Sequence, residues 1–270
     1  MTVIVAIANH NRGVGKTVTA ANLAAGLARA GRRTLAVDCD PQADLTRWLL
    51  DPADHDAADL AAIVVGGAEP AAAVRPTRVA GLDAIAATGR LAHLARALAA
   101  DRALIARALE GLGPCYDAMV LDLPSSLGRL TVSALAAAEG IAIPVPASVA
   151  GLRGLGGFRD WLASFRPDRA ITALVWGVLL TQADLDPQGG LATQVGRQVR
   201  DALAEFRVTG ARLLPVVVPG RVGVDELVAQ RLLVGDPAAH GGPGRAVVEA
   251  YARLVDYLLE RVPTAAGPTP

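Results

Sequence analysis

The sequence predicts a single α/β domain in which a mostly parallel, twisted sheet is flanked by helices on both faces. Short apolar segments alternate with longer Ala- and Leu-rich segments of helical periodicity along the chain, which is typical of strands joined by crossover helices. The 270 residues, 52% of them hydrophobic, are enough to bury the core of one large domain. We therefore predict one domain over residues 1–262 and a disordered tail over 263–270.

Seven apolar segments are the predicted strands. Each is rich in Val, Ile, Leu or Ala and short, as the buried strands of a parallel sheet are. In chain order they are Val3–Ala8, Thr34–Val37, Leu82–Ala86, Ala118–Leu121, Ile141–Val145, Ala173–Leu180 and Arg212–Val218.

Seven longer segments with helical spacing of apolar residues lie between and after these strands. They are centred on Thr17–Ala30, Asp101–Gly111, Leu127–Ala138, Gly151–Phe165, Gly190–Phe206, Gly223–Leu232 and Gly244–Arg261. The region Asp51–Pro76 is rich in Ala, Asp and Gly and less regular, so we expect a surface excursion with short helices there.

The composition excludes several classes of function. Equal numbers of basic and acidic residues, 26 of each, argue against coating nucleic acid by bulk charge but permit a local basic face. Cys39 and Cys115 form no metal-binding pattern, and no signal sequence precedes the first strand, so we expect a cytoplasmic protein. Proline and charge interrupt the longest weakly charged stretch, Leu130–Leu152, which argues against a membrane span.

A glycine-containing turn joins the first strand to the first helix. Gly13 and Gly15 allow backbone N–H groups to converge on an anion, and the following helix adds the positive end of its dipole. In such a loop, Lys16 reaches the β- and γ-phosphates and the Thr17 hydroxyl ligates Mg²⁺. His10 replaces the first Gly of the usual G-x-x-x-x-G-K-[ST] pattern. The sequence thus predicts a P-loop NTPase whose nucleotide-binding residues are Arg12, Gly13, Val14, Gly15, Lys16, Thr17 and Val18.

The lysine of this loop is the only lysine in the chain. Of the 26 basic residues, 25 are Arg and one is Lys16. Arg often replaces Lys on a surface, but not where a compact ammonium group must fit between phosphate oxygens. The position of this single Lys therefore favours a nucleotide site over an incidental Gly-rich turn.

Three carboxylates follow apolar strands. Asp38 and Asp40 are two residues apart at the end of the second strand, so both side chains point the same way if the extended geometry persists. Asp122 follows a later strand, where a Walker B carboxylate holds magnesium through water. Alone, each is more simply explained as a turn-forming residue at a strand end. Together with the loop, they predict a Mg²⁺-nucleotide site at the carboxyl edge of the sheet.

The segment "AIANHNRGVGKTVTAANLAAGLARAGRRTLAVDCDPQADLT" resembles the start of the ParA/MinD-family ATPases, whose deviant Walker A motif reads KGGVGKTT and whose next strand ends in VDxDPQ. The resemblance continues through "YDAMVLDLPSSLGRLTVSALAAAEGIAIPVPASVAGLRGL", "GVLLTQADLD" and "LLPVVVPGRVGVDELVAQ", and is strongest to the ParA (Soj-like) branch. It implies slow ATP hydrolysis by a homodimer that encloses the nucleotides between its subunits.

The resemblance also implies a role for each site residue and a set of partners. Lys16 and Thr17 bind phosphate and magnesium, Asp38 and Asp122 support the metal, and Asp40 orients the attacking water. Members of the ParA branch bind nucleoid DNA non-specifically as ATP dimers, and a ParB-like partner stimulates hydrolysis. We therefore expect ATP and Mg²⁺ as cofactors and a role in plasmid or chromosome partition, without membrane attachment.

The sequence departs from the family at the lysine that reaches across the dimer. That position is Asn11 here, and the following Gly is Arg12. One hypothesis is that Arg12 supplies the missing charge in trans and acts catalytically, as an arginine finger does. The alternative is that Arg12 faces solvent or DNA, and that the chain is a weakly hydrolysing or non-hydrolysing ATP-dependent dimer switch.

A second departure affects the expected contacts to base and DNA. Relatives read PRNVRLSEA where this chain has "PGRVGVDEL" (Pro219–Leu227), so two arginines of the family pattern are absent and Arg221 is the nearby candidate to compensate. The basic residues that could form a DNA-binding face in a dimer are Arg197, Arg200, Arg207, Arg221 and Arg245, although each by itself is more simply explained as an ordinary solvated charge.

Related functions remain to be separated. A MinD-like membrane positioner needs a basic amphipathic helix at its C-terminus, which the final residues do not predict. An iron–sulfur reductase needs paired cysteines across a dimer, and Cys39 and Cys115 are more simply buried or incidental thiols. A positioner of a non-DNA cargo shares all the motifs and stays open. His10 either touches a phosphate or is a turn residue.

Overall fold

The computed structural model describes residues 2–54, 58–65, 67–94, 97–98, 101–165, 170–186, 190–205, 213–240 and 244–262. One eight-stranded sheet in the order β3-β4-β2-β5-β1-β6-β7-β8 runs through this part of the chain. Every neighbouring pair is parallel except β3 and β4. The predicted α/β class is therefore confirmed, and the predicted tail over 263–270 lies outside the described residues.

All seven predicted strands are present, and their ends agree to within a few residues. The strands are β1 (Val3–Ile7), β2 (Thr34–Asp38), β3 (Val74–Pro76), β4 (Leu82–Ile85), β5 (Ala118–Asp122), β6 (Gly140–Pro146), β7 (Leu174–Ala183) and β8 (Leu213–Pro219). The sequence does not predict β3, because three residues that pair only with β4 at the edge of the sheet carry no recognisable strand pattern.

The helices also follow the predicted order. They are α1 (Lys16–Arg29), α2 (Asp44–Leu49), α3 (Leu60–Val65), α5 (Leu104–Glu110), α6 (Arg129–Ala137), α7 (Val149–Ser164), α8 (Gln194–Glu205), α9 (Arg221–Ala229) and α10 (Arg245–Leu259). Helix α2 is not predicted, and α8 starts four residues later than predicted because the preceding residues form a bridge between Leu185 and Leu191. Among the described residues, no helix has both the length and the apolar character needed to cross a membrane.

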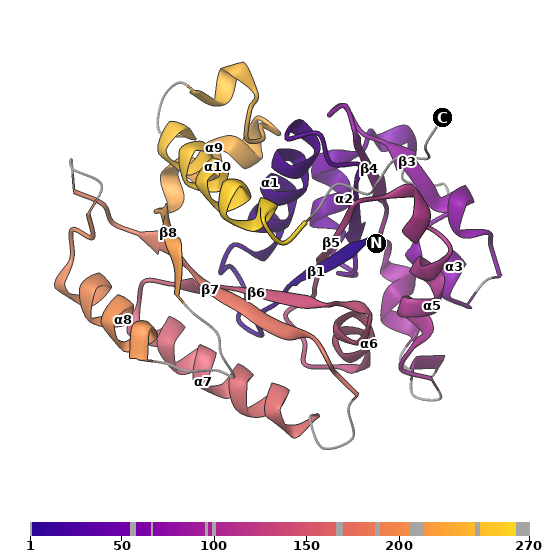
Figure 1. Cartoon of the computed structure of the whole chain (residues 1–270), viewed down its shortest axis with the longest axis horizontal. Helices are drawn as coiled ribbons and strands as arrows, with labels where there is room; N and C mark the ends of the chain where they lie inside the picture. The colour runs from indigo at the N-terminus through magenta and orange to yellow at the C-terminus, as the bar shows by residue number, and fades with distance from the viewer. Residues whose placement is uncertain are drawn as a thin grey trace.

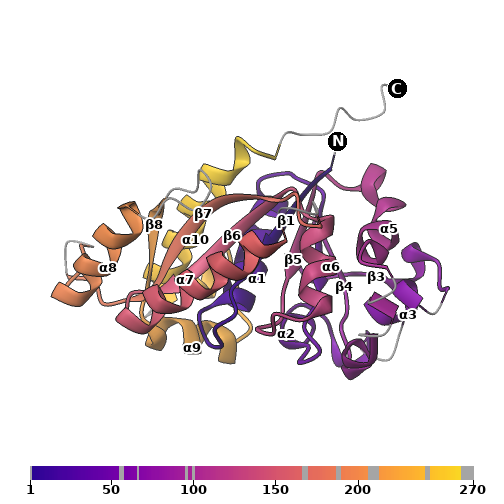
Figure 2. The ribbon, with the colours of Figure 1, turned by 90° about the horizontal axis from the view of Figure 1, so that it is seen from below.

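Helices cover both faces of the sheet (Figures 1 and 2). Successive residues of β1 alternate between the two layers: Val3, Val5 and Ile7 pack with α1, α2 and α10, whereas Ala6 and Ala8 pack with α3, α5, α6 and α7. The strands are apolar on both sides for this reason, since each side chain faces a helix whichever way it points.

Helix α1 packs on the sheet side by side with α10, and its Ala-rich composition follows from these close contacts. Residues 19–28 are all buried. A Cβ added to Gly26 would lie 2.3 Å from Val255 of α10, so the two helices approach more closely there than any larger residue allows. This packing fixes the helix whose N-terminus carries the P-loop.

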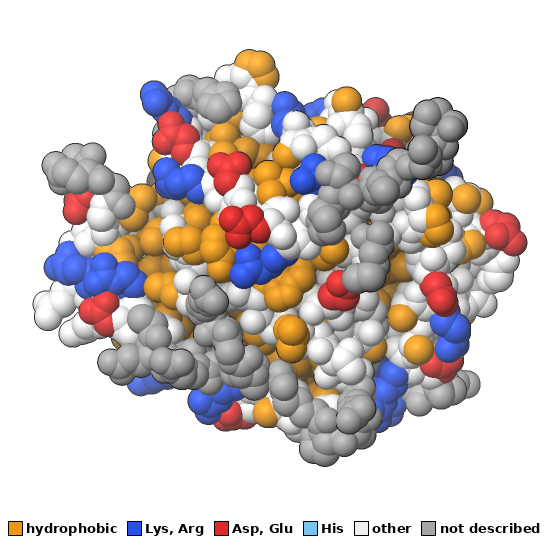
Figure 3. Space-filling view, viewed as in Figure 1, with side chains coloured by type: hydrophobic (Ala, Val, Ile, Leu, Met, Phe, Trp, Pro, Cys, Tyr) orange, Lys and Arg blue, Asp and Glu red, His pale blue; other side chains and the backbone are white. Residues whose placement is uncertain are grey.

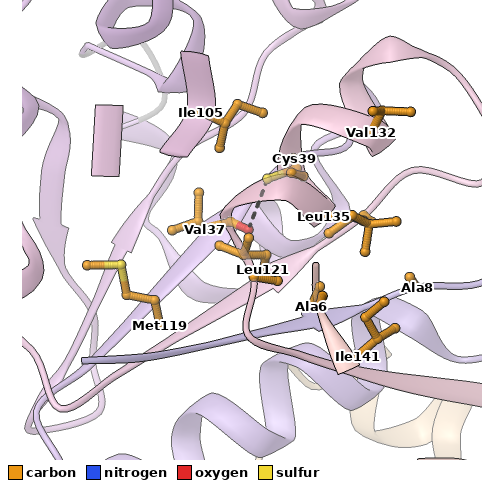
Figure 4. Packing of buried hydrophobic residues seen from close by; sticks show 14 of the residues in the cluster. Ala6, Ala8, Val37, Cys39, Ile105, Met119, Leu121, Val132, Leu135 and Ile141 are labelled. Atoms are coloured by element: carbon orange, nitrogen blue, oxygen red, sulfur yellow. Dashed lines mark hydrogen bonds between the residues drawn. The ribbon is translucent and has the colours of Figure 1, made fainter. Parts of the chain in front are cut away.

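The other layer of the core contains Cys39, whose thiol lies among Ile105, Val132 and Leu135 (Figure 4). Its Sγ lies 3.9 Å from the carbonyl oxygen of Val37, and burial raises the thiol's pKa well above its ordinary value. A buried, protonated thiol is unreactive. The interpretation of Cys39 as a buried thiol is confirmed, whereas Cys115 is exposed.

Two prolines occupy a central strand, β6, because β1 ends before it reaches them. The last backbone contact between these strands runs from the Ala8 N–H to the Ala142 carbonyl. Along one strand, alternate residues direct their backbone groups to the same side, so Pro144 and Pro146 also face β1. Their missing N–H groups cost no ladder bond there, and the Asn9 side chain donates to the Pro144 carbonyl at 2.8 Å instead.

Candidate nucleotide-binding site

The candidate site lies at the carboxyl edge of the sheet, where the strand order reverses. Strand β1 sits between β5 and β6, and such a switch point is where open α/β sheets bind ligands. A cleft of about 880 Å³ opens there. All seven predicted loop residues from Arg12 to Val18 line it, together with Asp40. The structure therefore brings together the residues that the sequence pattern selects.

The loop is built for an anion. Gly13 and Gly15 have φ angles of +67° and +94°, which side chains with a Cβ rarely adopt. Gly15 is the N-cap of α1, and no side chain caps the helix. The first N–H groups of α1 therefore lack an internal partner and open onto the cleft at the positive end of the helix dipole.

Lys16 extends back across the loop from the first turn of α1. Its side chain is 7% exposed, and Nζ donates to the Asn11 carbonyl at 2.9 Å and to Ser125 Oγ at 3.1 Å. Burial lowers the pKa of Lys16, whereas the charges of Asp122 and Asp40 oppose the decrease. A buried ammonium group at the edge of a cleft is stabilised by an anionic ligand.

Asp38 and Asp122 lie buried beneath the loop as register partners on β2 and β5. Asp38 accepts hydrogen bonds from the Asp40 N–H at 3.0 Å, the Thr46 N–H at 2.8 Å and Thr46 Oγ1 at 2.7 Å. Burial raises the pKa of Asp38 to about 6, although the bonds from Thr46 oppose the shift. Asp38 is therefore held rigidly below the loop.

Asp122 is less completely satisfied. Burial, followed by the charge of Asp38, raises its pKa well above the ordinary value, although a hydrogen bond with Thr17 and the charge of Lys16 lower it. Its Oδ1 is buried and has no hydrogen-bond partner. A buried carboxylate oxygen without a partner, beside a hydroxyl, fits the oxygen donors and the positive charge that Mg²⁺ requires.

Asp40 does not share the environment of Asp38. Strand β2 ends at Asp38, so the extended geometry that would point both carboxylates the same way does not persist. Asp40 is half-buried, lines the cleft and accepts a hydrogen bond from the Gln42 N–H at 2.9 Å. The two acids consequently differ: one is fixed under the loop, and the other faces the cleft.

The family of the chain follows from comparison with known proteins. A family model described as an AAA domain matches residues 2–170. Over 261 residues, 97% of each chain, the sequence is 36% identical to the chromosome-partitioning ATPase Soj of Thermus thermophilus. The chain belongs to the ParA/MinD family of ATPases. The resemblance seen in the sequence motifs is therefore confirmed.

Solved structures agree with this membership of the ParA/MinD family. An ATP complex of McdA from Cyanothece matches with a TM-score of 0.82 and 21% identity, over 96% of each chain. A cobyrinic acid a,c-diamide synthase from Mycobacterium smegmatis with bound ADP and magnesium matches with a TM-score of 0.76 and 28% identity, over 99% of this chain and 100% of the other. The first likeness shows the fold alone.

At the position of the family's signature lysine, the Asn11 side chain turns inward. A Cβ added to Gly154 of α7 would lie 2.0 Å from Asn11 Nδ2, so this amide packs directly against the backbone of α7 at Gly154. The neighbouring His10 stacks on Phe158 of the same helix, with ring centroids 6.5 Å apart. Arg12, by contrast, is exposed, lines the cleft and forms no ion pair with a described residue.

Two residues that shape the site are not found by sequence reasoning. Thr181 Oγ1 donates to the Val14 carbonyl at 2.9 Å, and Gln182 Nε2 donates to the Gly13 carbonyl. Both stand at the end of β7. A polar pair that closes an apolar parallel strand is the same signal that identifies Asp122, and it could have identified them.

The predicted basic residues do not gather on one face of a single chain. On α8, Arg197 donates to the Leu191 carbonyl and Arg200 pairs with Asp201, whereas Arg245 of α10 pairs with Glu249. Helices α8 and α10 lie on opposite faces of the sheet (Figure 1). Arg207 lies outside the described residues, as does the side chain of Arg221.

Proposed function

We propose that the chain is an ATP- and Mg²⁺-dependent partition ATPase that forms a nucleotide-sandwich homodimer, binds DNA non-specifically and responds to a ParB-like partner. The observation that carries the proposal is the unpartnered, buried Oδ1 of Asp122 beneath a P-loop that contains the chain's only lysine. A site with a buried ammonium group above and a buried carboxylate oxygen below suits a phosphate anion and its metal counter-ion.

Each residue has a role that its environment supports. The N–H groups of residues 13–18 and the Lys16 ammonium bind phosphate, and the Thr17 hydroxyl ligates the metal directly. Asp38 and Asp122 hold the metal from below, and Asp40, which faces the cleft, orients the attacking water. Bound magnesium supplies neutralisation of the charge that develops on the phosphate oxygens.

Arg12 is the residue we assign to the partner's phosphates. Asn11 cannot cross the dimer, because its amide rests on Gly154 within its own subunit. Arg12 is exposed at the mouth of the cleft, and its planar guanidinium is long enough to bind phosphate from a neighbouring position. A positive group delivered in this way lowers the barrier to phosphoryl transfer.

DNA binding and partition rest on the relatives. Soj of Thermus thermophilus is a chromosome-partitioning ATPase, and we propose the same function for this chain. On the face shown in Figure 3, basic and acidic side chains are interspersed. We propose that the DNA-binding surface is assembled from the basic residues of both subunits in the dimer. Such a dimer is expected to be nucleoid-associated in the cytoplasm.

Sedimentation with ADP, ATP and a slowly hydrolysed analogue, with and without duplex DNA, tests the proposal. We expect monomers with ADP, dimers with ATP, and salt-sensitive association of the dimer with duplex DNA. Lys16→Gln should abolish the dimer, whereas the matched control Arg253→Gln, at an exposed position of α10, should not. A chain that stays monomeric with every nucleotide contradicts the proposal.

The second candidate, an ATP-dependent dimer switch without significant turnover, is favoured by the inward position of Asn11. It predicts the same dimer but no phosphate release. A dimer that hydrolyses ATP and ignores DNA instead indicates a different cargo.

A further inference from the structure

The end of β7 holds the P-loop by two successive carbonyl groups. Thr181 Oγ1 donates to the carbonyl of Val14 at 2.9 Å, and Gln182 Nε2 donates to the carbonyl of Gly13. Thr181 is buried, so the first of these bonds is sheltered from water. The contacts join residues 167 and 169 positions apart in the chain at the loop that lines the cleft.

These two hydrogen bonds also fix the direction of the N–H group on the opposite side of each peptide. A peptide unit is planar and trans, so its C=O and N–H groups point in opposite directions. The Gly13 carbonyl belongs to the same peptide as the Val14 N–H, and the Val14 carbonyl to the same peptide as the Gly15 N–H. With both carbonyls held toward β7, the two N–H groups point away from it, and neither donates to an acceptor in the described part of the chain.

The loop needs such a support, because Gly13 and Gly15 are flexible. Both have positive φ angles, and without a Cβ either residue could rotate its neighbouring peptides at little cost. An anion site gains affinity when its donors are oriented before the ligand arrives. Two side-chain bonds from a packed strand provide that orientation.

The backbone of Gln182 is strained where its side chain contacts the loop. Its φ angle is +53°, a left-handed conformation that costs a residue with a Cβ on the order of 1 kcal/mol. Thr181 is fixed by the chain on its other side as well, because its carbonyl accepts the Ala147 N–H at 2.8 Å, just before α7. The end of β7 is therefore rigid where it meets the loop.

We propose that Thr181 and Gln182 are positioning residues that orient the Val14 and Gly15 N–H groups toward the β-phosphate of a bound nucleotide. The inference rests on the proposed nucleotide-binding function and adds two residues to its binding machinery. It assigns them no contact with the nucleotide itself; they act through the peptide groups whose carbonyls they hold.

The first test compares Thr181→Val with Thr181→Ser by calorimetric titration of ADP and Mg²⁺ into the intact chain. Val has the shape of Thr without the donor, so we expect a Kd about 10-fold weaker. Ser keeps the hydroxyl, so we expect a Kd within about 2-fold of the parent. Equal binding by the Val variant overturns the inference, and so does an equal loss in the Ser variant, because the hydroxyl is then not the agent.

Thr181→Val also leaves the Val14 carbonyl without a partner, which lowers stability by itself. Gln182→Gly separates the two effects, because the Gly13 carbonyl that it releases is exposed to water and because Gly adopts the left-handed conformation without strain. We expect the nucleotide-free variant to unfold at the same temperature as the parent or higher, while its Kd for ADP weakens about 3- to 10-fold. Unchanged binding overturns the assignment of Gln182. A parent chain that binds no ADP at all overturns the proposed function and this inference together.

Discussion

Two groups of charged side chains meet at the same edge of the sheet, and they differ in how far they are buried. Lys16, Asp38 and Asp122 are buried. Burial lowers the pKa of Lys16 and raises the pKa of both acids, so it favours the neutral form of each group. Arg12 and Asp40 line the open cleft. Buried charges are costly and immobile, so they suit a fixed ligand such as a phosphate or a metal ion. Exposed charges can reach a second molecule, as the proposed homodimer requires.

Substitution of Arg12, in the exposed group, is expected to give the largest effect, on ATP turnover. Arg12→Ala should lower the ATP turnover of the dimer by about 10³-fold, in the range of other arginine fingers, with little change in binding of ATP by one subunit. Single-turnover phosphate release measures the first quantity and calorimetry the second. Arg153→Ala, at an exposed position of α7, is the control. Unchanged turnover and dimerisation in Arg12→Ala would place this side chain among ordinary solvated charges.

The contact that holds Asn11 inward can be broken by one methyl group. Gly154→Ala places a Cβ 2.0 Å from Asn11 Nδ2, and because this amide ends a half-buried side chain that can turn toward solvent, the free energy of unfolding should fall by about 1 kcal/mol. Gly156→Ala, on the same helix with nothing within 4 Å of the new Cβ, should be neutral or stabilise by up to about 1 kcal/mol. Thermal unfolding of both variants measures the difference. The double variant Asn11→Ala with Gly154→Ala should recover the stability, and failure to recover it would show that α7 does not clash with this amide.

The buried acids should make the folded state less stable as the pH rises, whereas a carboxylate paired with a basic group makes it more stable. The pKa of Asp38 is raised from 3.8 to about 6 in the folded protein, so the folded state holds the proton more tightly than the unfolded chain. Its contribution to stability is therefore present below pH 4 and is lost as the pH rises through about 6, by about 3 kcal/mol at most. Thermal unfolding of the nucleotide-free protein between pH 5 and 8 measures this loss, and a stability that stays constant or rises over this range contradicts it.

Asp122→Asn removes one of the two neighbouring charges and should give the smallest change in stability. The Asn amide can occupy the place of the unpartnered Oδ1. We expect the nucleotide-free variant to gain about 1 kcal/mol at pH 8, or about 2–4 °C in Tm, and to lose part of the pH dependence of the parent. Magnesium should no longer strengthen its binding of ADP. A variant that is less stable than the parent at pH 8 would mean that the carboxylate is stabilised without a metal.

Sequence reasoning succeeded where the signal is local. The P-loop from Arg12 to Val18 and its cleft follow from a strand, a glycine turn and a helix that are adjacent in the chain. Asp122 was found because it ends an apolar strand. The same rule could have selected Thr181 and Gln182, but their partners are more than 160 residues away, and nothing in the sequence states which loop they meet.

The sequence by itself determined the class of fold, the order of the strands along the chain, and the identity of the anion-binding loop, because periodicity and glycine spacing act over a few residues. Only the tertiary structure decided which of the acids is buried, that Asn11 turns inward onto Gly154 while Arg12 stays exposed, and that β7 holds the loop. Those outcomes depend on contacts between segments far apart in the chain, where packing of several elements at once, rather than any local preference, selects the position of each side chain.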